Sequence, residues 1–250
     1  MDFNLTEEQL YFQNSVRSLA ENHLSKGNLE RAHDPNFPKD VAKLFAKNGL
    51  MGITLPENDG GQGGKLMDAV IAIEQVALVC PRSADVIQSG SFGPLRTFAE
   101  YASDFQKDKY LSKLLTGEIV IALGMTEPNA GSAVTDLTTK AVEDGEGYRV
   151  SGSKVFTSNS PDADIFLVYV RYHEGINGIG SVLIDRTMDG FTLGKPSKYT
   201  NGEEWCALYF DNVYVPKENI LLGPGGFKKQ IAGFNAERIG NTARSLAVGE

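Results

Sequence analysis

A turn rich in hydrogen-bond donors is the first stretch of this chain that could do chemistry. Residues 125–132 read Met-Thr-Glu-Pro-Asn-Ala-Gly-Ser and follow the apolar run 119–124, which has the length and β-branching of a strand. Pro128 and the turn-forming residues after it end that strand. The hydroxyls of Thr126 and Ser132 flank the turn. Such a turn can bind a phosphate or the polar edge of a ring, although an ordinary strand exit can have the same composition.

A second stretch, residues 148–159, reads Tyr-Arg-Val-Ser-Gly-Ser-Lys-Val-Phe-Thr-Ser-Asn. Its alternation predicts a strand that turns at Gly152 and then runs into Phe156, Thr157 and Ser158. From the residues alone, Phe156 is interpreted as a core residue.

Together the two stretches resemble two signatures of the acyl-CoA dehydrogenase family. The first matches residues 125–132, and the second, Gly-x-Lys-x-aromatic-x-Thr/Ser-Asn, matches residues 152–159, about twenty residues later. The resemblance extends over the whole chain, through residues 55–63, 106–114, 211–227 and 234–240. It implies an FAD-dependent enzyme that converts an acyl-CoA thioester to the trans-2-enoyl-CoA and passes the electrons to an electron-transfer flavoprotein.

The same resemblance implies which residues bind the cofactor. Met125, Thr126 and Ser132 would line the flavin ring and the adjoining substrate channel, with Ser132 facing the CoA part. Phe156 stands where the family usually has Trp, so it could pack against the ring but has no indole N–H to donate. Thr157 and Ser158 complete the cofactor-binding set, with Ser158 placed near flavin N5.

A base is needed as well, because the α-proton of a thioester is weakly acidic and calls for a carboxylate in a dry pocket. The resemblance implies Glu237, since isovaleryl- and long-chain-like members place the base on the first long C-terminal helix, beside an Arg that here is Arg238. Asn235 and Arg238 would contact the substrate, and Arg238 would help to anchor CoA. Without the resemblance, Glu237 is an ordinary helix-surface glutamate. Other members place the base late in the C-terminal domain, in sequence that this chain does not contain.

Composition excludes several other classes of function. The chain has 250 residues, a formal charge of −8 and a pI near 5.0, which gives nucleic acid no basic surface to bind. Two cysteines and three scattered histidines predict neither a disulfide framework nor a metal site. There is no signal-peptide pattern and no apolar run long enough for a membrane span. We therefore expect a soluble cytoplasmic protein with two packed thiols.

The hydrophobic pattern predicts an α+β fold in three parts: an N-terminal all-helical domain over 1–118, a middle β-barrel or sandwich domain over 119–226, and a return to helix over 227–250. The family resemblance implies that this last helix is the start of a C-terminal four-helix bundle. Strands do not alternate with helices, which excludes a doubly wound sheet. We expect helices at 6–24, 38–48, 66–80, 83–101, 104–115 and 227–250. We expect strands at 119–124, 138–143, 148–153, 165–171, 179–185, 205–210 and 212–215, and a loop at 216–226.

Some questions stay open at this stage. The last helix has no terminal cap, so we interpret the chain as truncated. The family implies a homo-oligomer, either a dimer or a tetramer. Glu127 is expected to face its own turn, and the pair Glu203–Glu204 is expected to be solvated surface. The alternatives are an acyl-CoA oxidase-like or acyl-carrier-protein-linked enzyme, or a non-catalytic partner subunit that completes a neighbour's site. The sequence does not fix the acyl chain.

Overall fold

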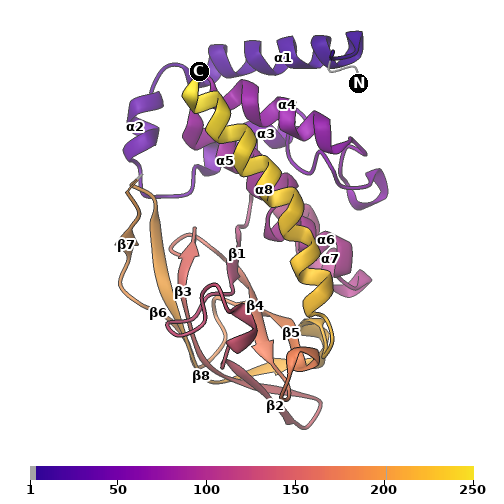
Figure 1. Cartoon of the computed structure of the whole chain (residues 1–250), viewed down its shortest axis with the longest axis vertical. Helices are drawn as coiled ribbons and strands as arrows, with labels where there is room; N and C mark the ends of the chain where they lie inside the picture. Colours follow the sequence, from indigo (N-terminus) through magenta and orange to yellow (C-terminus); the bar gives the residue numbers. More distant parts are fainter. Residues whose placement is uncertain (1–3, 201) are drawn as a thin grey trace.

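The computed structural model describes residues 4–200 and 202–250. Helices form the N-terminal part, strands form the middle, and one long helix returns along the N-terminal helices (Figure 1). The helices are α1 (Glu7–Leu24), α2 (Asn28–His33), α3 (Lys39–Lys47), α4 (Leu66–Ala77), α5 (Pro81–Ser91), α6 (Pro94–Tyr101), α7 (Asp104–Leu115) and α8 (Phe227–Gly249). The strands are β1 (Ile121–Gly124), β2 (Lys140–Asp144), β3 (Gly147–Ser158), β4 (Ile165–Arg171), β5 (Ile179–Asp185), β6 (Phe191–Leu193), β7 (Ser197–Lys198), β8 (Glu204–Pro216) and β9 (Ile220–Leu222). The predicted α+β class is confirmed.

Local capping chemistry explains where the helices begin. The Thr6 hydroxyl accepts from the Gln9 backbone N–H at 3.2 Å, and the Gln9 side chain accepts from the Thr6 N–H at 3.1 Å. These reciprocal bonds form a capping box at the start of α1. The sequence predicts a helix at 66–80 and a second one that begins at residue 83. Instead α4 already ends at Ala77, and Pro81 begins α5, because the first helical position needs no N–H donor.

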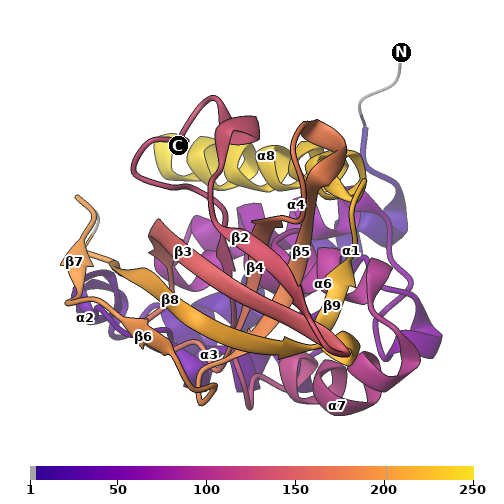
Figure 2. The same ribbon diagram turned by 90° about the horizontal axis from the view of Figure 1, so that it is seen from below.

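The strands form one sheet with the order β6-β8-β3-β2-β4-β5-β9, to which β1 and β7 add at β4 and β8. A hairpin joins β2 and β3, which pair from Lys140↔Ser151 to Asp144↔Gly147. Strand β1 runs parallel to β4, with Ile121 opposite Ile165 and Gly124 opposite Val168. In the view of Figure 2 the sheet lies in front of the helices. Strand β1 also contacts α6, so it connects the sheet to the helical layer.

Three strand predictions need correction. Strand β3 does not turn at Gly152: the register shifts there, Gly152 adopts a φ of +146°, and the strand continues to Ser158. A Cβ at Gly152 would lie 2.7 Å from the Cα of Thr139, so the neighbouring chain occupies that space. The two strands expected at 205–210 and 212–215 are one strand, β8, with Asn212 at a φ of +55°. The expected loop 216–226 contains β9, which pairs with β5.

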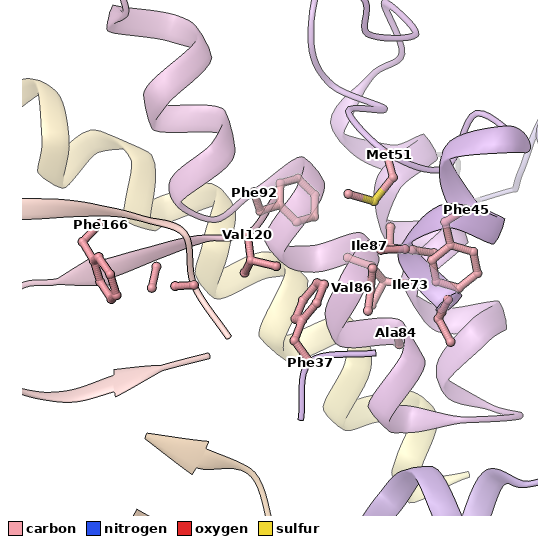
Figure 3. Packing of buried hydrophobic residues seen from close by; sticks show 14 of the residues in the cluster. Phe37, Phe45, Met51, Ile73, Ala84, Val86, Ile87, Phe92, Val120 and Phe166 are labelled. Atoms are coloured by element: carbon pink, nitrogen blue, oxygen red, sulfur yellow. The ribbon is translucent and has the colours of Figure 1, made fainter. Parts of the chain in front are cut away.

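Helices and sheet share one buried apolar cluster. Figure 3 shows Val120 and Phe166, from the strand region, in the same cluster as Phe92, Val86 and Phe37 from the helical part. All five side chains are buried. Cys80 and Cys206 are buried free thiols, as predicted. The shared core fixes α5 against the sheet, because close-packed interiors resist sliding.

Two further findings concern what the described residues do not form. Within 4–200 and 202–250, no helix is both long and apolar enough to cross a membrane. In the same part of the chain, no three His, Cys, Asp or Glu side chains gather as a metal site.

Helix α8 packs closely on α4 and α5 because the face that it buries is built of small residues (Figure 1). Ala236, Gly240, Ala243 and Ala247 are buried along this face. A Cβ added at Gly240 would lie 2.6 Å from Cδ2 of Phe92, which is itself buried. The absence of a side chain at Gly240 therefore sets how near α8 approaches α5.

Replacing Gly240 tests this packing. We expect Gly240→Ala to lower the free energy of unfolding by about 1–3 kcal/mol, because overpacking at Phe92 exceeds a helix-propensity gain of about 1 kcal/mol. Gly233→Ala on the same helix is the control, since its Cβ would come near only the Thr97 hydroxyl, at 3.1 Å. It should be neutral or slightly stabilising. Urea denaturation of both variants measures the difference, and equal stabilities would contradict the close approach of α8.

Candidate active site

A cavity of about 330 Å³ lies between α5, α8 and the ends of β1 and β3. Five of the residues predicted from the sequence line it: Met125, Thr126, Phe156, Ser158 and Glu237. They come from three segments that are far apart in the chain. The fold therefore brings both sequence motifs and the proposed base to one cavity.

A buried ion pair holds the two motifs together. Lys154 Nζ lies 2.8 Å from Glu127 Oε1, and the Lys154 side chain is fully buried. Lys154 also donates to the backbone carbonyl of Met125 at 3.1 Å, and the Val155 N–H donates to the Thr126 carbonyl at 2.8 Å. These contacts fix the first motif beside β3.

Contrary to expectation, the Glu127 side chain does not face its own turn but is hydrogen-bonded to the segment before β2, and it lies outside the cavity lining. Its two carboxylate oxygens accept from the backbone N–H and the hydroxyl of both Thr138 and Thr139, at 2.6–2.9 Å. Burial alone would raise the pKa of Glu127, but Lys154 and these hydrogen bonds lower it to about 2. Burial lowers the pKa of Lys154 to about 8, against the opposing effect of Glu127. Both groups are charged at neutral pH, so the ion pair is formed there.

Phe156 is presented to the cavity by a backbone irregularity. The register between β3 and β8 shifts between Lys154 and Thr157, and Phe156 adopts a φ of +56°. Its side chain is 57% exposed, which excludes the alternative that it is a core residue. The ring packs against Trp205 with centroids 4.6 Å apart, and Tyr199 Oη donates to the Phe156 carbonyl at 3.0 Å. Sequence reasoning missed both supporting aromatic residues.

Four predicted site residues lie outside the cavity lining. Thr157 is fully buried, and its hydroxyl has no hydrogen-bond partner among the described residues. Ser132 is exposed in the loop after β1. Asn235 and Arg238 are exposed on α8, 3.4 Å apart. The roles of these four residues toward cofactor or CoA stay predictions.

Glu237 is half-buried on the face of α8 that lines the cavity. Burial raises the pKa of Glu237 above its ordinary value, Asp85 raises it further, and Arg238 opposes the rise. A carboxylate with a raised pKa in a cavity is a stronger base than one in water.

The wall of the cavity that α5 and α8 form is polar, and sequence reasoning missed it by treating 83–101 as an apolar helical region. Gln88 Nε2 donates to Asn241 Oδ1 at 2.8 Å, across the contact between α5 and α8. Arg244 donates to Asp85 at 2.6 Å. The spacing of Asp85, Gln88 and Ser89 could have revealed a polar helix face, because residues three and four apart are neighbours.

Glu203 requires a correction. It was expected to be solvated surface, but it is buried and lies 3.0 Å from Arg82 Nη1. Arg82 also lies 3.5 Å from Asp85. Glu203, Arg82 and Asp85 thus alternate in charge along the polar wall. The segment before β8 is therefore part of the cavity and not a free edge, because Glu203 lines it.

Comparisons with known proteins agree on one family. The sequence matches the model of the acyl-CoA dehydrogenase N-terminal domain over residues 6–118 and that of the middle domain over residues 122–213. It is 32% identical to a short-chain-specific acyl-CoA dehydrogenase of Clostridium acetobutylicum, covering 100% of this chain and 67% of that protein. It is 36% identical to the mitochondrial isovaleryl-CoA dehydrogenase of Arabidopsis thaliana, covering 97% and 61%.

Solved structures give the same result. The butyryl-CoA dehydrogenase of Megasphaera elsdenii superposes with a TM-score of 0.88 at 30% identity, covering 99% of this chain and 67% of that one. The chain thus spans about two thirds, or less, of the length of these relatives.

The buried ion pair gives a stability prediction. Lys154→Met leaves Glu127 buried without its counter-charge, and we expect a loss of about 3–5 kcal/mol in the free energy of unfolding. The control is Lys198→Met, because Lys198 is 60% exposed and lies 3.9 Å from Glu204. That change should cost less than about 1 kcal/mol. Thermal denaturation distinguishes the two, and similar melting temperatures would show that the pair does not hold the motifs together.

The lowered pKa of Glu127 gives a pH prediction. Because the folded-state pKa of about 2 lies below the ordinary 4.5, its stabilising contribution is present above pH 4.5 and is lost as the pH falls toward 2. Over this range we expect the free energy of unfolding of the parent to fall by about 3 kcal/mol more than that of Glu127→Gln, because the glutamine does not titrate. Denaturant unfolding at several pH values measures both curves. Parallel curves would contradict the prediction.

Proposed function

The chain belongs to the acyl-CoA dehydrogenase family, and from this premise we propose that it is an FAD-dependent dehydrogenase of acyl-CoA thioesters. The observation that carries the proposal is the convergence of Glu237 with both sequence motifs on one cavity. In the proposed reaction the Cα proton passes to Glu237, a hydride leaves Cβ, and a double bond forms between the two carbons. The product is the trans-2-enoyl-CoA.

The residues around the cavity fit a flavin ring. Phe156 offers an exposed aromatic face, Met125 offers a polarisable side chain, and the hydroxyls of Thr126 and Ser158 can bond to polar ring edges. Asn159 also lines the cavity, and its buried Oδ1 has no partner among the described residues, so it can accept from a ring N–H. FAD, when bound, would accept the hydride.

Glu237 has the properties that the proton transfer requires. Its position in a partly enclosed cavity removes water that would weaken the carboxylate as a base. Burial and, to a lesser degree, Asp85 raise the pKa of Glu237, which brings it closer to the pKa of the weakly acidic Cα–H. The protonated carboxyl cannot act as a base, so we expect activity to fall as the pH is lowered. Because the pKa of Glu237 is raised, this fall should occur at a pH above the ordinary pKa of a glutamate.

The finer parts of the proposal concern partners. Ser132, Asn235 and Arg238 are exposed near the cavity-lining segments, which suits contact with a CoA moiety that lies partly in solvent. Two electrons must leave the reduced cofactor, and the family resemblance points to an electron-transfer flavoprotein as acceptor. A homo-oligomer, dimer or tetramer, and a cytoplasmic location belong to the same proposal.

Anaerobic titration of the full-length protein with a panel of acyl-CoA thioesters tests the assignment. We expect the flavin absorbance band to bleach in the parent, and the bleaching rate in Glu237→Gln to fall by about 10²–10⁴-fold, the usual contribution of a general base. Glu118→Gln is the control, because Glu118 is exposed and lies outside the cavity lining.

Other outcomes would overturn parts of the proposal. Equal bleaching of parent and Glu237→Gln would place the base elsewhere. A protein that binds flavin only when a second subunit is co-expressed would instead support the partner-subunit alternative. Rapid reoxidation of the reduced protein by O₂ would indicate an oxidase.

A further inference from the structure

The cavity has an unusual wall for a site that would bind a hydrocarbon chain. On α8, Asn241 and Arg244 follow Glu237 on the face that lines the cavity, four and seven residues later. On α5, Asp85 and Gln88 face them. Four polar side chains thus surround the space on the α5–α8 side of the proposed base.

Most of the charge in this wall is already paired. Asp85 lies 2.6 Å from Arg244 and 3.5 Å from Arg82, and Arg82 lies 3.0 Å from Glu203. An acidic ligand group would find its cations occupied and would also face Glu237. The ion pairs therefore leave no unpaired charge among the four residues of this wall to bind a charged acyl group.

Gln88 has unused capacity to accept a hydrogen bond. Its Nε2 donates to Asn241, but its Oε1 has no partner among the described residues, although Gln88 is only 5% exposed. A buried acceptor without a partner costs about 1–3 kcal/mol. An alkyl chain beside Gln88 would leave that cost in place, whereas a ligand O–H or N–H would remove it.

We propose that the acyl group of the substrate carries an uncharged hydrogen-bond donor, a hydroxyl or an amide N–H, which Gln88 binds beside Asn241. This inference rests on the proposed function and names its substrate class. Polar acyl-CoA thioesters are then preferred over alkyl thioesters of the same size. The origin of the preference is the hydrogen bond, since a site built to bind a donor rejects an analogue that lacks it.

A matched pair of thioesters tests the inference. 4-Hydroxybutyryl-CoA and pentanoyl-CoA differ only by exchange of a terminal hydroxyl for a methyl group. With the full-length holoenzyme and an artificial electron acceptor, we expect kcat/KM to be about 10–100-fold higher for the hydroxy compound, the usual effect of one buried hydrogen bond. This measurement needs no variant, so it is independent of any folding defect.

Two variants then locate the effect. Gln88→Leu has nearly the same volume and should abolish or reverse the preference, measured as the ratio of kcat/KM for the two thioesters. Asn241→Leu should reduce the preference less, because Asn241 only holds Gln88 in place. A purely structural role would lower the melting temperature and slow both thioesters equally.

The outcomes separate the inference from the function on which it rests. Flavin bleaching by pentanoyl-CoA as fast as by 4-hydroxybutyryl-CoA, with an unchanged ratio in Gln88→Leu, would overturn the inference and leave the dehydrogenase assignment standing. A bound flavin that no acyl-CoA of the panel bleaches would overturn both.

Discussion

The site depends first on the buried ion pair between Glu127 and Lys154. It connects two segments that are 27 residues apart in sequence and carry the two recognisable motifs. Because both groups are almost fully buried, neither can be solvated alone, and each holds the other in a single position. The four donors from Thr138 and Thr139 then fix the carboxylate, and the Met125 carbonyl fixes the ammonium. The orientation of the turn after β1 follows from this network.

A second constraint is the distance between α8 and α5. Gly240 lies one turn from both Glu237 and Arg244 and contacts Phe92 without a side chain between them. Phe92 belongs to the cluster that also contains Val120 and Phe166, so α8 is positioned against the same core that positions β1 and β4. The base and the motif residues are thus held by one packed unit. A shift of α8 would move the carboxylate away from the aromatic ring of Phe156.

Much of the fold could be predicted because the signals were long and local. The strands at 165–171 and 179–185 were predicted with the observed ends, since continuous apolar runs mark buried strands. Strands β6, β7 and β9 have three residues or fewer and leave no periodic signal. The bulge at Phe156 could not be predicted, because its positive φ is set by pairing with β8 and by support from Trp205 and Tyr199. The motif residues came from family resemblance. The polar wall was missed because its meaning requires knowing that α8 covers that face of α5.

The polar wall and the proposed base are electrostatically linked through Asp85. The negative charge of Asp85 is one cause of the raised pKa of Glu237, and without compensation it would keep the carboxyl protonated over a wider pH range. Arg244 and Arg82 bind Asp85 and offset part of that charge. The same ion pairs leave Gln88 as the member of the wall with a free acceptor. The paired charges of Asp85, Arg82, Arg244 and Glu203 therefore allow Glu237 to ionise. Because these charges are paired with one another, the acyl group is recognised by an uncharged hydrogen bond to Gln88.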